Sequence, residues 1–248
     1  KECSFQGQRM EVAANDIFAN PKNSVFALNG DGTMLAVSFA GGGLVIFDLE
    51  RPDEDLIMFD ESQYIHFEGG FCGKYFAFAA DESGGSLFGL IDTEEAVYVG
   101  GYESQNNFYL KAEESGIYLA NGNLLVHFDP ETQEETELAY TDEENITGFS
   151  IHEGCSLVAT DLPGFAFFDS GAHEMSSEST REPCDFAVLA GKHGILANRS
   201  EPSVRFMKRE DHEEACILSY DARYSHDEAR VSQDQKTAML FSFENFRV

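Results

Sequence analysis

A short apolar strand that ends in aspartate recurs along this 248-residue chain at a spacing near 40 residues. Four copies end in Asp48, Asp92, Asp129 and Asp169, which are 44, 37 and 40 residues apart. A fifth copy at residues 204–208 has Lys208 in that place, 39 residues after the last aspartate. A fixed period of this length indicates repeated units that cannot bury their apolar faces alone and so pack against one another.

Each copy lies inside a larger unit with a common order of strands and turns. In the first unit, an apolar strand at residues 25–28 precedes the turn at residues 29–32, whose sequence is Asn-Gly-Asp-Gly. Glycine and asparagine are favoured there because hairpin turns need positive φ. An Ala-containing strand, a Gly-rich connection, the Asp-ending strand and a last strand at residues 56–59 complete the unit. In the second unit, we expect a strand at residues 64–67 and a turn at residues 68–73.

Four short strands in every period of ~40 residues are typical of the blades of a β-propeller. The second and third strands of each unit are almost continuously apolar, which indicates burial on both faces between neighbouring blades. The fourth strands are more polar, as expected at the rim, and no stretch has a sustained helical period. We therefore predict an all-β fold, a β-propeller of about six four-stranded blades, with a stacked β-solenoid as the structural alternative.

The repeats predict one domain over residues 1–248. Its blades are expected near residues 23–60, 61–103, 104–144, 145–182, 183–221 and 222–248, the last together with residues 3–14. The sixth unit ends near its third strand, and an open blade would leave an exposed sheet edge. We predict that an N-terminal strand at residues 10–14 closes this blade, with residues 3–6 adding to it. The alternative is a seventh blade that lies outside this chain.

A net charge of −29 restricts the possible partners. Nucleic-acid binding depends on Lys and Arg neutralising phosphates, and anionic membrane surfaces also repel an acidic protein. No apolar run reaches the ~18 residues that span a bilayer. The sequence therefore predicts no nucleic-acid partner and no direct membrane insertion in this segment. The acidity is expected to serve solubility, or alternatively to bind cations or a basic partner.

Residues that often catalyse reactions or bind metals are present without recognisable spacing. The five cysteines form no C-x-x-C pair and are an odd number, so we expect reduced thiols rather than disulfides or zinc. The chain has no G-x-S-x-G, no phosphate-binding loop and no H-E-x-x-H. His66 and His152 lie in or just after the first strands of alternate blades. Each is expected to make an ordinary hydrogen bond, and the alternative is a metal site that they share near the axis. We predict no catalytic residue, no metal site and no cofactor, and a structural turn role for the repeated aspartates.

The units resemble the WD40 and YVTN-type propeller repeats. The resemblance lies in the Gly/Asp turn after the first strand, the Ala-containing second strand and the aromatic-Asp end of the third, as in Phe47-Asp48 and Phe128-Asp129. It covers nearly the whole chain, which lacks the Trp and the Gly-His pair of eukaryotic WD40 repeats. The resemblance implies a scaffold for protein or ligand contacts. Propellers also include hydrolases and lactonases, so fold does not decide function.

In resembling proteins, ligands usually bind the face formed by the starts of the first strands and the connections between second and third strands. Polar residues at these places are predicted to form a binding ring. They are Gln63, Asp81, Asn107, Asn121, Thr147, Asp161, Asp185, Asn198, Arg199 and Asp227.

The sequence favours a non-catalytic binding module that recognises a protein or peptide, and we expect a monomer. Two alternatives remain open: a metal-dependent hydrolase of the propeller lactonase type, and a structural or sensor domain of a membrane-tethered protein. The Trp-free repeats and the acidity favour a bacterial origin and an extracytoplasmic location, with a cytoplasmic location also open.

Overall fold

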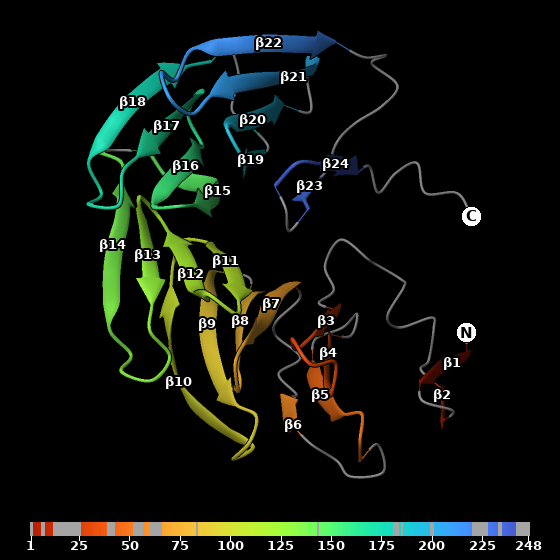
Figure 1. Ribbon diagram of the computed structural model, residues 1–248. Helices are drawn as coiled ribbons and strands as arrows, with labels where there is room; N and C mark the ends of the chain where they lie inside the picture. The colour runs from red at the N-terminus through yellow and green to blue at the C-terminus, as the bar shows by residue number, and fades with distance from the viewer. Residues whose placement is uncertain are drawn as a thin grey trace. The chain divides into compact units, whose positions relative to one another are not determined.

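In the computed structural model, the described residues form strands and turns, which confirms the predicted all-β class. They are residues 2–5, 8–11, 26–38, 43–51, 57–59, 66–82, 84–142, 144–180, 184, 186–198, 201–219, 228–232 and 235–241. Five four-stranded antiparallel sheets follow one another along this part of the chain (Figure 1). Their order agrees with the predicted repeats, because each sheet contains one Asp-ending strand or its Lys-ending counterpart as the third strand.

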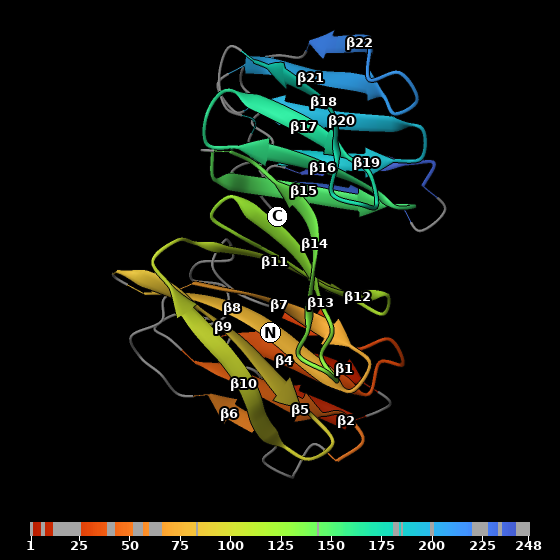
Figure 2. The same cartoon turned by 90° about the vertical axis from the view of Figure 1, so that its left-hand side faces the viewer.

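The strands of the second sheet are longer than those of the first. The first comprises β3 (Phe26–Leu28), β4 (Met34–Ser38), β5 (Leu44–Asp48) and β6 (Ile57–Phe59). The second comprises β7 (His66–Cys72), β8 (Tyr75–Glu82), β9 (Gly85–Asp92) and β10 (Val97–Ser104). In the second sheet the strands lie side by side in sequence order, from β7 at one edge to β10 at the other (Figure 2).

The next three sheets repeat this meander. The third comprises β11 (Phe108–Glu113), β12 (Gly116–Asn121), β13 (Leu124–Phe128) and β14 (Glu135–Tyr140). The fourth comprises β15 (Ile146–His152), β16 (Cys155–Thr160), β17 (Gly164–Phe168) and β18 (Glu174–Ser179). The fifth comprises β19 (Phe186–Ala190), β20 (His193–Asn198), β21 (Glu201–Lys208) and β22 (Glu214–Ser219).

Two hairpins lie near the ends of the chain. β1 (Glu2–Phe5) pairs with β2 (Gln8–Glu11), and β23 (Glu228–Val231) pairs with β24 (Ala238–Phe241). The second hairpin lies where the sixth unit was predicted. Residues 12–14 and the predicted third strand of that unit at residues 246–248 lie outside the described residues. Closure of the sixth blade by N-terminal strands therefore stays a prediction, as do the single domain and its blade boundaries.

The chain divides into two compact units, residues 1–119 with 127–135, and residues 120–126 with 136–248. In the first unit, the core between its first two sheets contains Leu44, Ile46, Phe76 and Phe78, all fully buried. In the second unit, the fourth and fifth sheets share a core that includes Leu157, Phe167 and Leu196. Both cores consist of apolar residues from middle strands, as the continuous apolar runs predicted.

The first strand of the second sheet is longer than expected. We predicted a turn at residues 68–73, but β7 continues to Cys72 and only Gly73 and Lys74 form the turn. The glycines of the predicted turn serve close packing instead. A Cβ atom at Gly70 would lie 2.8 Å from the carbonyl oxygen of Ala112 in β11, so glycine allows these two strands to approach. The prediction was wrong because it took the Gly-Gly pair as a turn signal.

The fourth strands differ in polarity more than expected. β18 is polar, with sequence Glu-Met-Ser-Ser-Glu-Ser, and agrees with the expectation. β22 has the sequence Glu-Ala-Cys-Ile-Leu-Ser, and all six of its residues are exposed. The expectation of a uniformly polar rim is therefore wrong for β22.

Candidate functional site

The residues predicted to form the binding ring are described in part. Asp81 and Asn107 lie in the first unit, and Asn121, Thr147 and Asp161 lie in the second. Asn198 ends β20, but its side chain lies outside the described residues. The remaining members, all outside the described residues, are Gln63, Asp185, Arg199 and Asp227. The ring itself stays a prediction, and only its described members can be placed locally.

Asp161 joins the start of the fourth sheet to the connection between β16 and β17. Its Oδ1 accepts a hydrogen bond from the backbone N–H of Asn145 at 2.9 Å, and its Oδ2 accepts one from Asn145 Nδ2 at 2.7 Å. The backbone N–H of Asp161 donates to the carbonyl oxygen of Asn145 at 2.9 Å. These three bonds fix the residue that precedes β15. The Asp161 carboxylate is thus an internal clamp, although it is exposed.

The clamp presents Leu162 to solvent on a fixed loop. The Thr160 hydroxyl donates to the Leu162 carbonyl oxygen at 2.9 Å, and the Thr180 N–H donates to the Pro163 carbonyl oxygen at 3.1 Å. The Leu162 side chain is 53 % exposed, and Pro163 is exposed beside it. An apolar side chain on a loop that is already ordered loses little conformational entropy when a partner covers it.

The connection between β14 and β15 is tied to the turn between β12 and β13. The Thr141 N–H donates to the Asn123 carbonyl oxygen at 3.0 Å, and Asn123 Nδ2 donates to the Thr141 carbonyl oxygen at 2.8 Å. The Ile146 N–H donates to the Gly122 carbonyl oxygen at 2.7 Å. Three connections of the second unit therefore form one rigid edge, which we name the Leu162 edge. It comprises residues 121–123, 141–142, 144–146 and 160–163.

The other described members of the predicted ring have simpler surroundings. Asp81 Oδ1 accepts a hydrogen bond from the Ser86 hydroxyl at 2.6 Å, and Asn107 is exposed before β11. Asn121 is half-buried at the end of β12. Thr147 lies at the irregularity in register between β15 and β16, and its buried Oγ1 has no hydrogen-bond partner. Of the residues in the Leu162 edge, the sequence analysis selected Asn121 and Asp161 but not Asn145 or Leu162.

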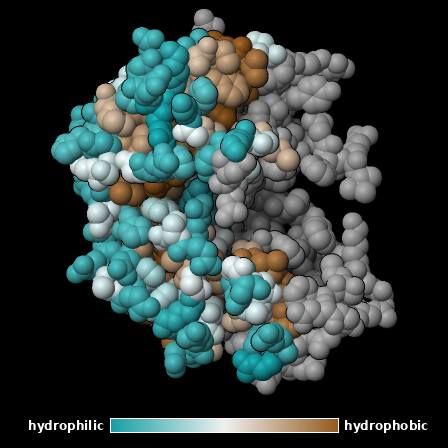
Figure 3. Space-filling view, viewed as in Figure 1, coloured by the Kyte–Doolittle hydropathy of each residue, from teal (hydrophilic) through white to brown (hydrophobic). Residues whose placement is uncertain are grey.

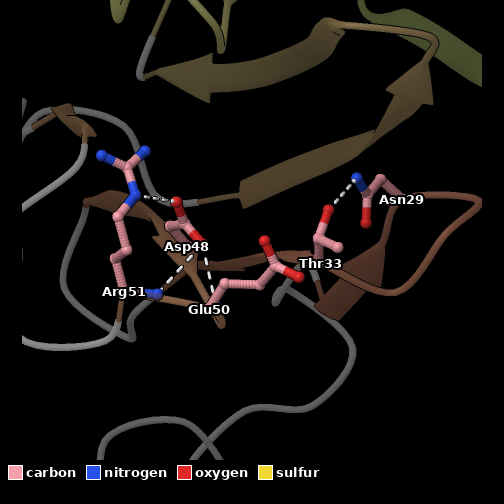
Figure 4. Close-up of polar contacts among 5 residues, drawn as sticks. All are labelled: Asn29, Thr33, Asp48, Glu50 and Arg51. Atoms are coloured by element: carbon pink, nitrogen blue, oxygen red, sulfur yellow. Dashed lines mark hydrogen bonds and ion pairs between the residues drawn. The ribbon is translucent and has the colours of Figure 1, made fainter.

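The repeated aspartates close the turns between third and fourth strands, at the ends of the third strands away from the second–third connections. Asp48 Oδ1 accepts the N–H groups of Glu50 and Arg51 at 2.8 and 3.2 Å (Figure 4). Asp92, Asp129 and Asp169 likewise each accept two backbone N–H groups from the following residues. This side-chain-to-backbone pattern is an Asx-turn. The predicted structural turn role of the four aspartates is confirmed.

The fifth sheet builds the same turn with different residues. Lys208 stands in the aspartate position, and its Nζ binds Asp211 Oδ2 at 3.2 Å. Asp211 Oδ1 accepts the N–H of Glu213 at 3.1 Å. A carboxylate three residues later has therefore replaced the missing aspartate. In the first sheet, Asn29 Nδ2 donates to the Thr33 hydroxyl at 3.0 Å (Figure 4). Asn29 Oδ1 accepts the N–H of Met34 at 2.8 Å, and the Gly32 N–H donates to the Asn29 carbonyl oxygen at 3.1 Å, which confirms residues 29–32 as a turn.

The turn hydrogen bonds favour the charged carboxylates. The N–H groups of Thr132 and Glu131 lower the pKa of Asp129, and those of His173 and Gly171 lower the pKa of Asp169. Burial raises the pKa of Asp92, but the Lys74 ammonium at 2.8 Å and two turn N–H groups outweigh it, and the pKa lies below its usual value. Each of these aspartates is therefore ionised at neutral pH.

These lowered pKa values predict acid sensitivity. A lowered folded-state pKa contributes stability that is complete above the ordinary Asp pKa of about 4 and is lost as the pH falls below it. We expect the Tm, followed by circular dichroism, to fall between pH 5 and about pH 2. Asp129→Asn keeps an Oδ1 acceptor but cannot ionise, so its Tm should depend less steeply on pH than that of the wild type. Equal slopes for the two proteins would contradict this expectation.

The histidines and cysteines whose side chains are described do not converge on one site. His152 Nε2 lies 3.8 Å from Glu153 Oε2, and the side chain of His66 lies outside the described residues. Cys72, Cys155, Cys184 and Cys216 form no disulfide, and burial raises the pKa of Cys155. Within the described ranges, no group of three His, Cys, Asp or Glu side chains could hold a metal ion.

Comparisons with known proteins show the fold. A chain in the crystal structure of a mitotic checkpoint complex matches with a TM-score of 0.68 at 11% identity, covering 88% of this chain and 71% of that chain. The β-propeller domain of Cps50 (Swd1) from Myceliophteria thermophila matches with a TM-score of 0.65 at 13% identity, covering 90% and 81%. The WD40 repeats of RRP9 match with a TM-score of 0.64 at 13% identity, covering 87% and 71%. This chain has the fold of a WD40 β-propeller.

The WD40 likeness is one of structure alone. No family model and no curated protein matches the sequence. In the fourth sheet, Leu162 lies before β17 and the Asp169 turn lies after it, so the two are at opposite ends of this strand. No helix long and apolar enough to cross a membrane occurs in the part of the chain that the structure describes.

Proposed function

We propose that this propeller is a protein-recognition module and that the Leu162 edge contacts its partner. The observation that carries the proposal is the exposed Leu162 on a loop fixed by the Asn145–Asp161 clamp. The repeated aspartates, by contrast, already use their carboxylates in turns. A rigid edge with one projecting apolar side chain suits recognition of another protein segment, because little entropy is lost on binding.

Charge indicates what kind of segment would bind. Asp142 and Asp161 are exposed on the Leu162 edge, Glu144 is half-buried beside them, and the chain carries a net charge of −29. Complementary charge speeds encounter and suppresses wrong partners. We therefore infer a peptide or protein surface that combines an aliphatic or aromatic side chain with Lys or Arg. The mitotic checkpoint complex supports this proposal by showing a structurally similar propeller within a protein assembly.

Replacing Leu162 tests the proposal. The probe is a fluorescein-labelled peptide with a Leu-Phe-Leu centre flanked by Lys and Arg, and binding is followed by fluorescence anisotropy. Leu162→Ser removes most of an apolar contact, and we expect the Kd to rise about tenfold. Leu162 is exposed, so the Tm should hardly change.

Two comparisons make the result specific. Met175→Ser removes an exposed apolar side chain from β18 and should leave the Kd unchanged. A peptide with Asp and Glu in place of Lys and Arg should bind weakly. The proposal is wrong if Leu162→Ser and Met175→Ser affect binding equally, or if added salt abolishes binding while Leu162→Ser does not change it.

A further inference from the structure

β22 is an exposed edge strand with an apolar sequence. Among the described strands it pairs only with β21, so no described strand forms hydrogen bonds with the other side of its backbone. Ile217 and Leu218 are 47 % and 57 % exposed, and Cys216 beside them is also exposed. Brown and tan side chains gather at the top of Figure 3, where β21 and β22 lie in Figure 1.

The apolar side chains of β22 lie on both faces of the sheet. Leu218 is paired with Val204 and Cys216 with Phe206, so these two share the face of the core cluster that contains Val204. Ile217 is paired with Arg205, which lies on the opposite face. Arg205 donates to Glu214 at 3.2 Å and to Glu178 of β18 at 3.4 Å. A strand added beside β22 would therefore find apolar neighbours on both faces.

β22 lacks the features that usually protect sheet edges. Natural edge strands avoid pairing through Lys, Pro, inward-pointing charges or shortness. The last five residues of β22 include no charged residue and no Pro. The irregularity in the pairing of β22 with β21 lies at the beginning of β22, between Glu214 and Cys216. The equivalent strand β18 carries Glu174 and Glu178 among serines. The difference between these equivalent strands indicates that β22 is suited to pairing.

We propose that β22 binds a basic, extended segment of another protein as an additional strand of its sheet. Backbone hydrogen bonds would give the affinity, and alternating side chains the specificity. The turn before β22 supplies the charge that selects a basic partner. Glu210, Asp211, Glu213 and Glu214 are exposed there, with Lys208 and Arg205 neutralising part of this charge. This surface is separate from the Leu162 edge and does not depend on it.

Charge also argues against a second copy of this chain as the occupant. Two copies that paired edge to edge would each bring a net charge of −29 and would place the acidic turns near the same interface. A basic segment removes this repulsion and adds attraction.

Cys216 reports occupancy of β22 directly. The full chain is labelled with iodoacetamide, and the modification of Cys216 is followed by peptide mass spectrometry. Cys155 and Cys184 are buried and serve as internal references. The probe is the acetylated peptide Arg-Val-Arg-Ile-Arg-Val amide, added at increasing concentration. We expect saturating peptide to slow the labelling of Cys216 about tenfold and to leave the buried thiols unchanged.

Matched variants separate strand addition from general attraction to an acidic protein. Ile217→Lys adds a cation to the edge and should weaken binding of the peptide. The peptide concentration that protects Cys216 should rise about tenfold. Met175→Lys makes the same change on β18 at a side chain of similar exposure, 42 %, and should alter protection little. Unchanged Tm values establish that both variants are folded. A peptide with Pro in place of the central Ile keeps the charge but cannot pair and should protect poorly.

Four results would overturn the proposal. Cys216 could be slow to label in the free protein at all concentrations, because another segment of this chain covers β22. Its labelling could slow with protein concentration alone, which would indicate pairing between two copies. The Pro-containing peptide could protect as well as the probe, or Ile217→Lys could behave like Met175→Lys.

Discussion

Replacing Asp92 with alanine is expected to lower the free energy of unfolding by about 3 kcal/mol, measured by urea denaturation. The Asp92 side chain is nearly buried and accepts the N–H groups of Glu94 and Glu95, both at 3.0 Å. Its Oδ2 also lies 2.8 Å from Lys74 Nζ. Alanine would remove the acceptor for both N–H groups and leave the partly buried ammonium without its partner.

The repeat supplies a matched control for this loss. Asp129 makes the same turn with Glu131 and Thr132, is more exposed, and has no ion pair of this kind with any residue that the structure describes. Asp129→Ala should therefore lower the free energy of unfolding clearly less than Asp92→Ala does. The free energy of unfolding of Asp92→Asn, which retains an Oδ1 acceptor, should lie between those of the wild type and Asp92→Ala. Equal losses at positions 92 and 129 would show that the lysine contributes nothing.

Gly89→Ala is expected to destabilise the protein by about 2–3 kcal/mol. Gly89 in β9 is paired with Phe78 in β8, and the fully buried Phe78 ring lies over the place that a Cβ atom would occupy. The ring is packed in the core of the first two sheets and has no free space to move into. The midpoint of urea denaturation should fall, while the slope stays that of the wild type.

A second strand glycine controls for backbone entropy. At Gly148 in β15, the nearest atom to an added Cβ would be Phe186 Cα, at 3.9 Å, which is ordinary contact. Gly148→Ala should leave stability unchanged or raise it by about 0.5 kcal/mol through the unfolded state. A loss at Gly148 as large as that at Gly89 would contradict the assignment of the effect to the Phe78 ring.

The spacing of the aspartates was enough to predict the first four sheets, because the same Asx-turn recurs in each of them. An Asx-turn needs only the aspartate and the two or three residues that follow it, so it is visible in the sequence. The extent of β7 was not visible in this way. Gly69 and Gly70 read as a turn signal, yet they lie in a strand because β8 and β11 approach them closely.

The candidate site was predicted only in part, because its contacts join residues that are distant in sequence. Asp161 was selected as a polar loop residue, but its partner Asn145 is 16 positions away and becomes evident only from the pairing of β15 with β16. Leu162 follows Asp161 directly and was passed over, because apolar loop residues are common and carry no signal of their own. The exposure of Ile217 was missed because the strand pattern alone predicts a polar rim.

Within the first unit, hydrogen bonds link the second sheet to β11 and to Glu135, the first residue of β14. At the inner strands, the Glu68 carboxylate accepts the N–H of Leu110 at 3.2 Å, so that β7 satisfies a backbone donor of β11. At the outer strands, the Tyr102 hydroxyl of β10 donates to Glu135 of β14 at 2.9 Å. Neither of these two sheets can unfold alone without breaking the hydrogen bonds between them. In hydrogen exchange they should therefore behave as one cooperative folding unit, with the amides of β9 and β11 exchanging at a common rate.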